Sequence, residues 1–127
     1  MTNFLIVGAG GFIGSCARFA FTKLANLLPF SFPLGTLFSN ITAAFLVGFI
    51  IGVGHETLVI SPKTKLFLTT GIMGGLSTFS TFSLETVTLF QDGRYLGTAG
   101  NILLNLVLSL SFTVFGMLLA RSLFSKA

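Results

Sequence analysis

The fold is decided by the stretch Gly71-Ile-Met-Gly-Gly-Leu-Ser-Thr-Phe-Ser-Thr-Phe-Ser83. It lies inside an apolar segment, yet Gly71, Gly74 and Gly75 stand where a continuous helix would be expected. Each glycine in a helix interior costs about 1 kcal/mol relative to alanine. In lipid, a broken backbone is tolerated only where it is buried in protein or lines a wet cavity. We therefore predict a membrane-spanning helix that is broken at Gly74-Gly75.

The second half of this stretch is rich in hydroxyl groups and carries two aromatic rings. Phe79 and Phe82 are three residues apart, so they share one face of a resumed helix. The hydroxyl residues around them are Ser77, Thr78, Ser80, Thr81 and Ser83. This combination predicts a small polar pathway that contains two phenyl rings.

The composition of the whole chain is that of a membrane protein. Of its 127 residues, 53% are hydrophobic and only 8% are charged, whereas about 25% are charged in a typical soluble domain. Several charge-free runs reach or approach the roughly 18 residues that mark a membrane-spanning helix. We predict one all-α transmembrane domain over residues 1–127, embedded in the lipid bilayer, with four spans at about 3–28, 34–54, 65–90 and 95–122.

Two soluble functions that the sequence superficially suggests are excluded. The net charge of +4 comes from basic residues scattered at span ends, which make no basic face for nucleic acid. Gly8, Gly11 and Gly14 imitate a dinucleotide-binding fingerprint, but that motif needs an acidic residue about 20 positions further on. The first acidic residue is Glu56. We interpret small residues four apart in this span, Gly10 with Gly14 and Gly11 with Ser15, as close-packing positions between membrane helices, and likewise Gly48 and Gly52 of the second span.

The basic residues give only a weak orientation bias. One side of the membrane would hold Lys63, Lys65, Arg121 and Lys126, against Lys23, Arg94 and the nearby Arg18 on the other. A chain with so little bias can insert both ways up. Because four short spans enclose little space, we expect a homodimer, and the charges leave open whether it is antiparallel or parallel.

Polar residues in the other spans are candidates for the pathway. Asn40 in the second span either bonds neighbouring helices or donates to a permeating species. In the fourth span a polar residue recurs every four positions, which places one polar stripe along a helix. The members of this stripe are Asn101, Asn105, Ser109 and Thr113.

Two charged residues near span ends have alternative interpretations. Arg18 either extends toward the lipid headgroups or faces the bundle, where it would attract an anion or bond freed carbonyls. Glu85 is either a surface residue at a helix end or part of the rim of a vestibule, and we favour the rim. His55 and Glu56 are expected in a solvated loop, because one histidine and one acid fall short of a metal site.

The available chemistry favours a small, strongly hydrated anion. No acid or histidine lies in the middle of a span, which removes the usual proton-relay and cation-binding groups, and no constellation for catalysis is present. Amide N–H groups, hydroxyls and the partially positive edges of phenyl rings remain. A break in the third span also frees backbone carbonyls. If two subunits met there on a two-fold axis, those oxygens would form a cage for a monovalent cation.

Three segments together resemble the Fluc (CrcB) family of fluoride channels, and the match covers essentially the full chain. They are Gly10-Gly-Phe-Ile-Gly-Ser-Cys-Ala-Arg18, Gly35-Thr-Leu-Phe-Ser-Asn40 and Gly74-Gly-Leu-Ser-Thr-Phe-Ser-Thr-Phe82. The resemblance implies an antiparallel, dual-topology homodimer with two pores. It also implies that the dimer exports fluoride passively across the bacterial cytoplasmic membrane.

The resemblance also implies roles for individual residues. Asn40 would donate to fluoride, and Phe79 and Phe82 would supply ring-edge contacts, with Ser80 and Thr81 beside them. The track on the fourth helix would consist of Asn105, Ser109 and Thr113. The carbonyls of Gly74 and Ser77 would bind a structural sodium ion at the dimer interface, with Arg18 close to that break.

Two other functions compete with a fluoride channel. A small four-span, proton-coupled multidrug exporter would also be dimeric, but it couples protons through an acid buried in its first span, and this chain has none there. An assembly subunit without a pathway would use the polar stripe only to bond helices together. It predicts no flux, and loss of association when Ser109 and Thr113 become alanine.

Overall fold

The computed structural model describes residues 1–56 and 60–125, and for Glu56 the backbone alone. Lys126, which entered the charge comparison above, lies outside the described residues. Within the described ranges the chain forms helices and turns and contains no strand. The long helices are α1 (Thr2–Ala25), α2 (Leu34–Glu56) and α6 (Tyr95–Phe124). The third predicted span is divided into α3 (Pro62–Leu66), the π-helix η1 (Phe67–Met73), α4 (Gly74–Leu76) and α5 (Phe79–Gln91).

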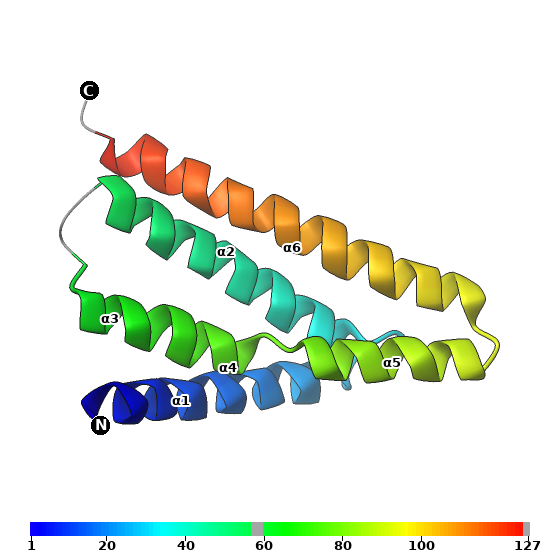
Figure 1. Ribbon diagram of the computed structural model, residues 1–127. Coiled ribbons are helices and arrows are strands. Elements are labelled where there is room, and N and C mark those ends of the chain that lie inside the picture. Colours follow the sequence, from blue (N-terminus) through cyan, green and yellow to red (C-terminus); the bar gives the residue numbers. More distant parts are fainter. Residues whose placement is uncertain (57–59, 126–127) are drawn as a thin grey trace.

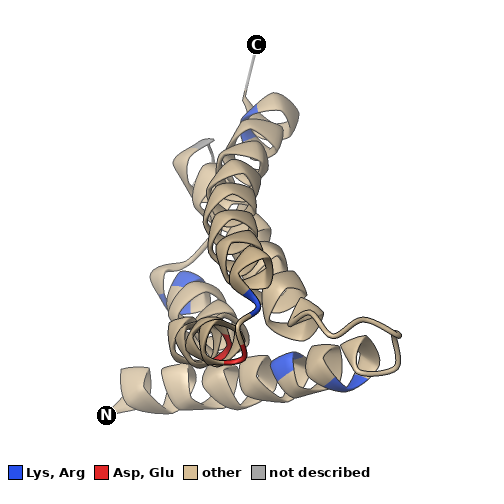
Figure 2. Ribbon diagram, turned by 90° about the vertical axis from the view of Figure 1, so that its right-hand side faces the viewer, with Lys and Arg blue, Asp and Glu red and all other residues tan. Residues whose placement is uncertain are grey.

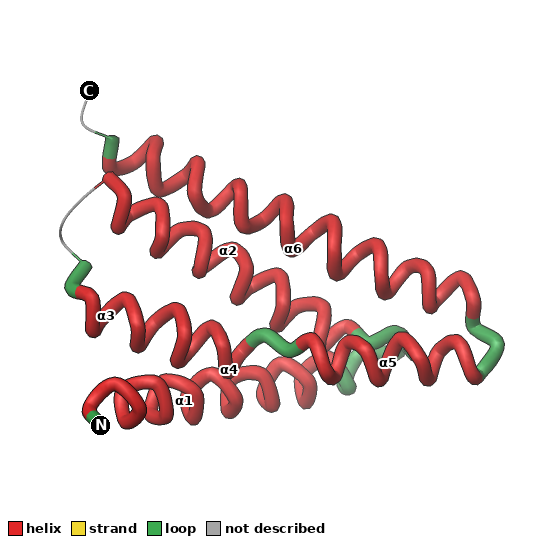
Figure 3. The backbone as a smooth tube through the Cα atoms, viewed as in Figure 1, coloured by secondary structure: helices red, strands yellow, loops and turns green. Residues whose placement is uncertain are grey.

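The helices run alternately in opposite directions and pack chiefly as two pairs (Figure 1). In one pair α1 lies along η1 and α4, and in the other α2 lies along α6. In the view of Figure 3, α3 and α4 lie between α1 and α2, and the non-helical connection between α4 and α5 is also visible. The polar residues discussed below lie where this connection faces α2 and α6.

The surface is that of a protein surrounded by lipid. Three helices, Thr2–Ala25, Leu34–His55 and Tyr95–Phe124, are long and apolar enough to cross a membrane. The buried apolar cluster is small and centres on Ala43, Met73 and Leu76, whereas most large apolar side chains point outward. Lys and Arg residues lie mainly toward the ends of helices, and most of α6 is free of charged residues (Figure 2).

Glycines of α1, η1 and α4 let the backbones of these helices approach each other. A Cβ added to Gly10 would lie 2.8 Å from Gly71 Cα, and one added to Gly75 would lie 3.1 Å from Gly11 Cα. A Cβ on Gly14 would overlap the carbonyl group of Ile72. The predicted close packing of the first helix is therefore confirmed, and Gly71 and Gly75 serve the same contact.

The predicted break at Gly74-Gly75 is wrong in position, because both glycines are helical. The chain leaves helical conformation at Ser77, with ψ 152°, and at Thr78, with φ −152° and ψ 120°. Thr78 then caps α5, because its Oγ1 accepts the Thr81 N–H at 3.2 Å. The break depends on a capping hydroxyl, whereas Gly75 is needed for contact with α1.

The second pair is also packed through glycine. A Cβ on Gly48 would overlap the carbonyl group of Thr113, and one on Gly52 would lie 2.6 Å from the Ala120 Cβ. This confirms the close-packing role predicted for both glycines. The contact brings the polar stripe of α6 against α2.

The connections differ in part from the expectation. The first helix ends at Ala25, and a turn follows it. His55 and Glu56 are the last residues of α2 and not part of a loop. At the other end of the bundle, the Arg94 guanidinium donates to the Ser31 carbonyl at 2.7 Å and to Ser31 Oγ at 3.0 Å. This pair of bonds ties the α1–α2 connection to the start of α6.

Candidate functional site

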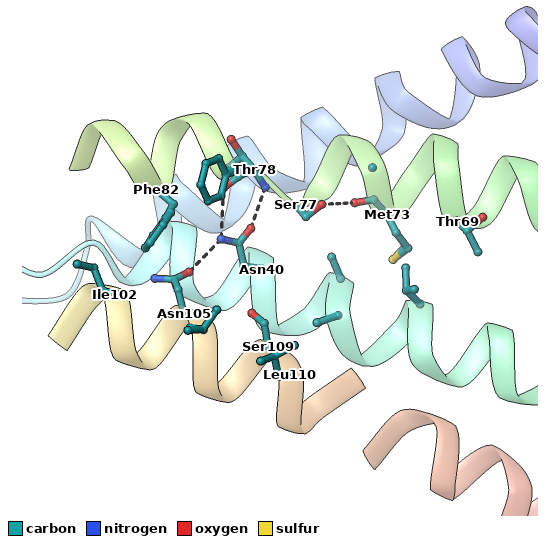
Figure 4. Close-up of a pocket in the computed structure, with 16 residues that line it drawn as sticks. Asn40, Thr69, Met73, Ser77, Thr78, Phe82, Ile102, Asn105, Ser109 and Leu110 are labelled. Atoms are coloured by element: carbon teal, nitrogen blue, oxygen red, sulfur yellow. Dashed lines mark hydrogen bonds between the residues drawn. The ribbon is translucent and has the colours of Figure 1, made fainter. Parts of the chain in front are cut away.

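A cavity of about 580 Å³ lies between α2, α6 and the segment from η1 to α5 (Figure 4). We call the non-helical residues Ser77 and Thr78, between α4 and α5, the interruption. Apolar side chains make up much of the cavity wall, and the polar groups cluster beside the interruption. Five residues predicted for a pathway line it: Asn40, Phe79, Phe82, Asn105 and Ser109. The structure thus brings together residues from three helices that are far apart in sequence.

The two phenyl rings belong to the first turn of α5. Their centroids are 5.6 Å apart, and the ring planes are inclined by 46°. Phe79 is 79% exposed in this single chain, whereas Phe82 is half-buried. Because the Thr78 cap starts the helix immediately before them, it also sets the direction in which both rings leave the backbone.

Asn40 bonds the interruption to α6. Its Oδ1 accepts the Thr78 N–H at 2.8 Å, and its Nδ2 donates to the Thr78 carbonyl at 3.3 Å. The same Nδ2 donates to Asn105 Oδ1 at 2.9 Å. Figure 4 shows these bonds on the wall of the cavity. The amide therefore replaces helical hydrogen bonds that the interruption removes, and it also faces the cavity.

The hydrogen-bonded chain continues from Asn105 along α6. Asn105 Nδ2 donates to the Asn101 side-chain oxygen at 2.9 Å and to the Asn101 carbonyl at 3.0 Å. Asn101 Nδ2 donates to Thr86 Oγ1 at 2.9 Å, and that hydroxyl donates to the Phe82 carbonyl at 2.7 Å. The chain of amides thus runs from the start of α5, through α2 and α6, and returns to α5.

Three other predicted pathway residues lie outside the wall of this cavity. Ser80 is exposed, and its Oγ lies 3.3 Å from Thr78 Oγ1. Thr81 Oγ1 accepts a hydrogen bond from Thr78 Oγ1 at 3.0 Å. Thr113 donates its hydroxyl proton to the Ser109 carbonyl of its own helix at 2.9 Å. Ser80 and Thr81 lie beside the cap, and Thr113 lies one turn beyond the cavity wall.

A second cavity of about 400 Å³ lies between α1, α2 and the first turn of α5. Arg18 and Thr81 line it together with Thr36 of α2. Thr36 Oγ1 donates to Glu85 Oε1 at 2.7 Å, and Glu85 Oε2 is buried without a hydrogen-bond partner among the described residues. Glu85 is therefore turned toward α2, and Arg18 lines a polar hollow near α5.

Backbone oxygens at the interruption lack the amides that an unbroken helix would offer them. The N–H of Thr78, four residues after Gly74, bonds Asn40 Oδ1 instead of the Gly74 carbonyl. The N–H of Thr81, four residues after Ser77, bonds Thr78 Oγ1. Gly74 and Ser77 are both exposed in the single chain. Neutral carbonyl oxygens are ligands that suit hard cations.

Sequence reasoning missed two members of this constellation. Asn101 was recognised in the stripe of α6 but given no role in the site, and Thr86 was not considered. The spacing offered a clue, since Asn101 and Asn105 are four residues apart and lie on one helix face. The Asn101–Thr86 contact joins two helices, so it required the structure.

The fold and this site define a multi-pass helical membrane protein with an uncharged, hydrogen-bonding cavity between its helices. Within the described residues, the structure contains no group of three or more His, Cys, Asp or Glu side chains that could hold a metal ion. A family model described as CrcB-like protein, Camphor Resistance (CrcB), matches residues 5–117. The chain belongs to this family.

Several similar proteins carry the name fluoride-specific ion channel FluC. The one from Clostridium perfringens (strain 13 / Type A) is 50% identical over 121 residues, which cover 94% of each chain. The one from Clostridium novyi (strain NT) is 47% identical over 92% of each chain. The one from Serratia proteamaculans (strain 568) is 43% identical over 94% of each chain.

Proposed function

We propose that this protein is a passive, fluoride-selective ion channel of the bacterial cytoplasmic membrane, and not an enzyme. The observation that supports this most directly is the cavity that combines Phe79 and Phe82 with the amides of Asn40 and Asn105. The names of the relatives agree with it. Residues 62–91 would form the remaining membrane crossing, broken at Ser77 and Thr78.

The chemistry of the cavity fits an anion that gives up water for neutral donors. Ring edges and N–H groups offer partial positive charge, and the cavity wall contains no ammonium or guanidinium group that would hold the ion tightly. Both Nδ2 protons of Asn40 have protein acceptors, Thr78 O and Asn105 Oδ1. Fluoride would take one of them in a charge-assisted bond, which is stronger than the amide–amide bond it replaces.

The functional unit would be an antiparallel, dual-topology homodimer with two pores. The outward-facing apolar side chains and the 79% exposure of Phe79 support a partner subunit that covers part of this surface. In the dimer, Arg18 and Glu85 would lie beside the vestibules, and Ser80, Thr81, Ser109 and Thr113 would supply hydroxyl groups along the pathway.

A sodium ion would bind at the dimer interface through the carbonyls of Gly74 and Ser77. The donor set fits such an ion, because both oxygens are neutral and their usual amide partners bond elsewhere. A sodium ion there would offset the repulsion between carbonyl oxygens that face one another across the two-fold axis. Thermal melting of the purified protein should rise in sodium relative to an equal concentration of N-methylglucamine; equal melting temperatures would count against the site.

A fluoride efflux assay tests the function. Liposomes that contain the purified protein and both halides should lose fluoride rapidly while retaining chloride, and protein-free liposomes should retain both. Equal loss of the two ions would contradict selectivity. A proton-coupled exporter is less favoured because α1 contains no acidic residue, and uptake of an organic cation driven by a pH gradient would revive it.

A further inference from the structure

Asn101 lies at the buried end of the amide chain, away from the cavity wall. It is 0% exposed, and Asn105 is 6% exposed. We propose that Asn101 is a positioning residue that, through Asn105, fixes the direction in which Asn40 presents its N–H groups to the cavity. This inference rests on the proposed fluoride pathway. It assigns to Asn101, which does not line the cavity, an indirect effect on the donor that faces the ion.

The amides of Asn40 and Asn105 are each held in direction by one backbone group. The N–H of Thr78 can only donate, so Asn40 must turn its Oδ1 toward it. The carbonyl of Asn101 can only accept, so Asn105 must turn its Nδ2 toward it. The two amide groups that remain are then a donor and an acceptor, and Asn40 Nδ2 donates to Asn105 Oδ1.

The side chain of Asn101 reinforces this direction at the Asn105 end. Its Oδ1 offers Asn105 Nδ2 a second acceptor, 2.9 Å away. Its own orientation is fixed in turn, because its Nδ2 donates to Thr86 Oγ1, whose proton goes to the Phe82 carbonyl. Burial removes water as a substitute partner, and an unpaired buried amide costs about 1–3 kcal/mol. Without this side chain, one N–H of Asn105 must find another acceptor.

The consequence reaches Asn40, because Asn105 Oδ1 occupies the place beside its Nδ2 that a permeating anion would take. While no ion is bound, this oxygen keeps the donor of Asn40 directed between α5 and α6. If Asn105 turns to satisfy its own N–H groups, two amide donors face each other, and Asn40 must rotate or shift. The donor is then no longer aimed at the space beside Phe79 and Phe82.

The test is the fluoride current through single channels in planar bilayers, measured against fluoride concentration. Unitary current does not depend on how many channels fold, so a purely structural loss would leave it unchanged. Asn101→Leu, which keeps bulk but removes both polar ends, should lower unitary current about tenfold at subsaturating fluoride, a size typical of coupled neighbouring residues. The half-saturating fluoride concentration should rise.

Two further variants make the test specific. Thr86→Val removes the partner of Asn101 Nδ2 while keeping the side-chain shape, and it should lower the unitary current in the same direction but less. Thr98→Ala is the matched control. It removes a threonine hydroxyl of α6 that donates to the Arg94 carbonyl and takes no part in the amide chain. It should conduct like the wild type.

A double-mutant cycle identifies Asn105 as the intermediary. In an Asn105→Ala background, adding Asn101→Leu should cause no further loss of unitary current. Additive losses, or a wild-type unitary current in Asn101→Leu, would overturn the proposal. So would failure of both Asn101→Leu and Thr86→Val to assemble, because that would assign the amide chain to folding. If the wild type carries no fluoride current, the proposed function itself fails, which is a separate result.

Discussion

At the scale of single residues, the two phenyl rings differ in how much protein surrounds them. Phe79 projects from the chain, whereas Phe82 is half-buried beside Asn105 in the cavity wall. Both are replaced with little change in volume by isoleucine, which removes the positive ring edge but keeps an apolar contact. The rings can therefore be tested without emptying the site.

We expect Phe79→Ile and Phe82→Ile each to lower fluoride efflux from liposomes by at least about tenfold. A tenfold slower efflux corresponds to a barrier about 1.4 kcal/mol higher, which we expect when a dehydrated ion loses its contact with one ring edge. Both variants should elute from size-exclusion chromatography at the wild-type volume. Wild-type efflux rates in both would remove the rings from the mechanism.

Hydroxyl groups on α6 also differ in what they can offer an anion. Thr113 already gives its proton to the Ser109 carbonyl, so it presents mainly lone pairs, whereas Ser109 lines the cavity. We predict that Ser109→Ala slows fluoride efflux about tenfold, the loss expected for one hydrogen bond to an ion. Thr113→Val should have a smaller effect. A larger effect at Thr113 would show that its proton is redirected toward the ion.

The sequence could supply these residue types but not all of their contacts. The stripe from Asn101 to Thr113 follows from the helical repeat alone, and the sharing of one face by Phe79 and Phe82 follows from their spacing. Whether Asn40 bonds another helix or serves the cavity could not be decided, because the outcome depends on the interruption opposite it. In the structure its amide bonds Thr78 and faces the cavity, so the helix contact is established and donation to a permeating ion stays a prediction.

At the scale of helices, the glycines carry more packing information than the hydrophobic pattern does. We expect Gly14→Ala to prevent normal assembly, because the new methyl group would overlap the Ile72 carbonyl, a backbone atom that cannot move aside easily. Gly8→Ala is the matched control on the same helix, since nothing lies within 4 Å of a Cβ there. Thermal melting in detergent measures the difference, and equal stability of the two variants would contradict the packing.

The position of the interruption shows where reasoning from helix propensity fails. Three glycines predicted a weak point, but Gly71 and Gly75 are held in helical form by contact with α1. The chain departs from the helix two residues after Gly75, where Asn40 and the Thr78 hydroxyl accept the backbone N–H groups. Tertiary partners, which a single sequence does not reveal, therefore decide where the backbone opens.

At the scale of the whole molecule, the charge-free runs predicted the approximate bounds of two long helices, since helix α2 and helix α6 lie close to the predicted 34–54 and 95–122. The pairing of α1 with η1 and of α2 with α6 did not follow. All four predicted spans are apolar on most sides, so the sequence gives no strong preference for one neighbour over another.

The proposed antiparallel dimer predicts how the chain is labelled across a membrane. With the exposed Cys16 replaced by serine, a single cysteine at Lys63 should react with an impermeant maleimide to roughly half its full extent in intact vesicles, because both orientations are present. Detergent should restore full reaction. Reaction of nearly all or nearly none of the sites in intact vesicles would favour a single orientation and a parallel dimer.

The Asn40–Thr78 contact has a consequence for how the chain is made. The helix that follows the interruption has only 13 residues, fewer than the roughly 20 needed to cross a bilayer unaided. Asn40 precedes Thr78 by 38 positions, so it has already been synthesised when the interruption leaves the ribosome. Helix α2 can therefore offer the Asn40 side chain to the open backbone between α4 and α5 as soon as that backbone enters the lipid.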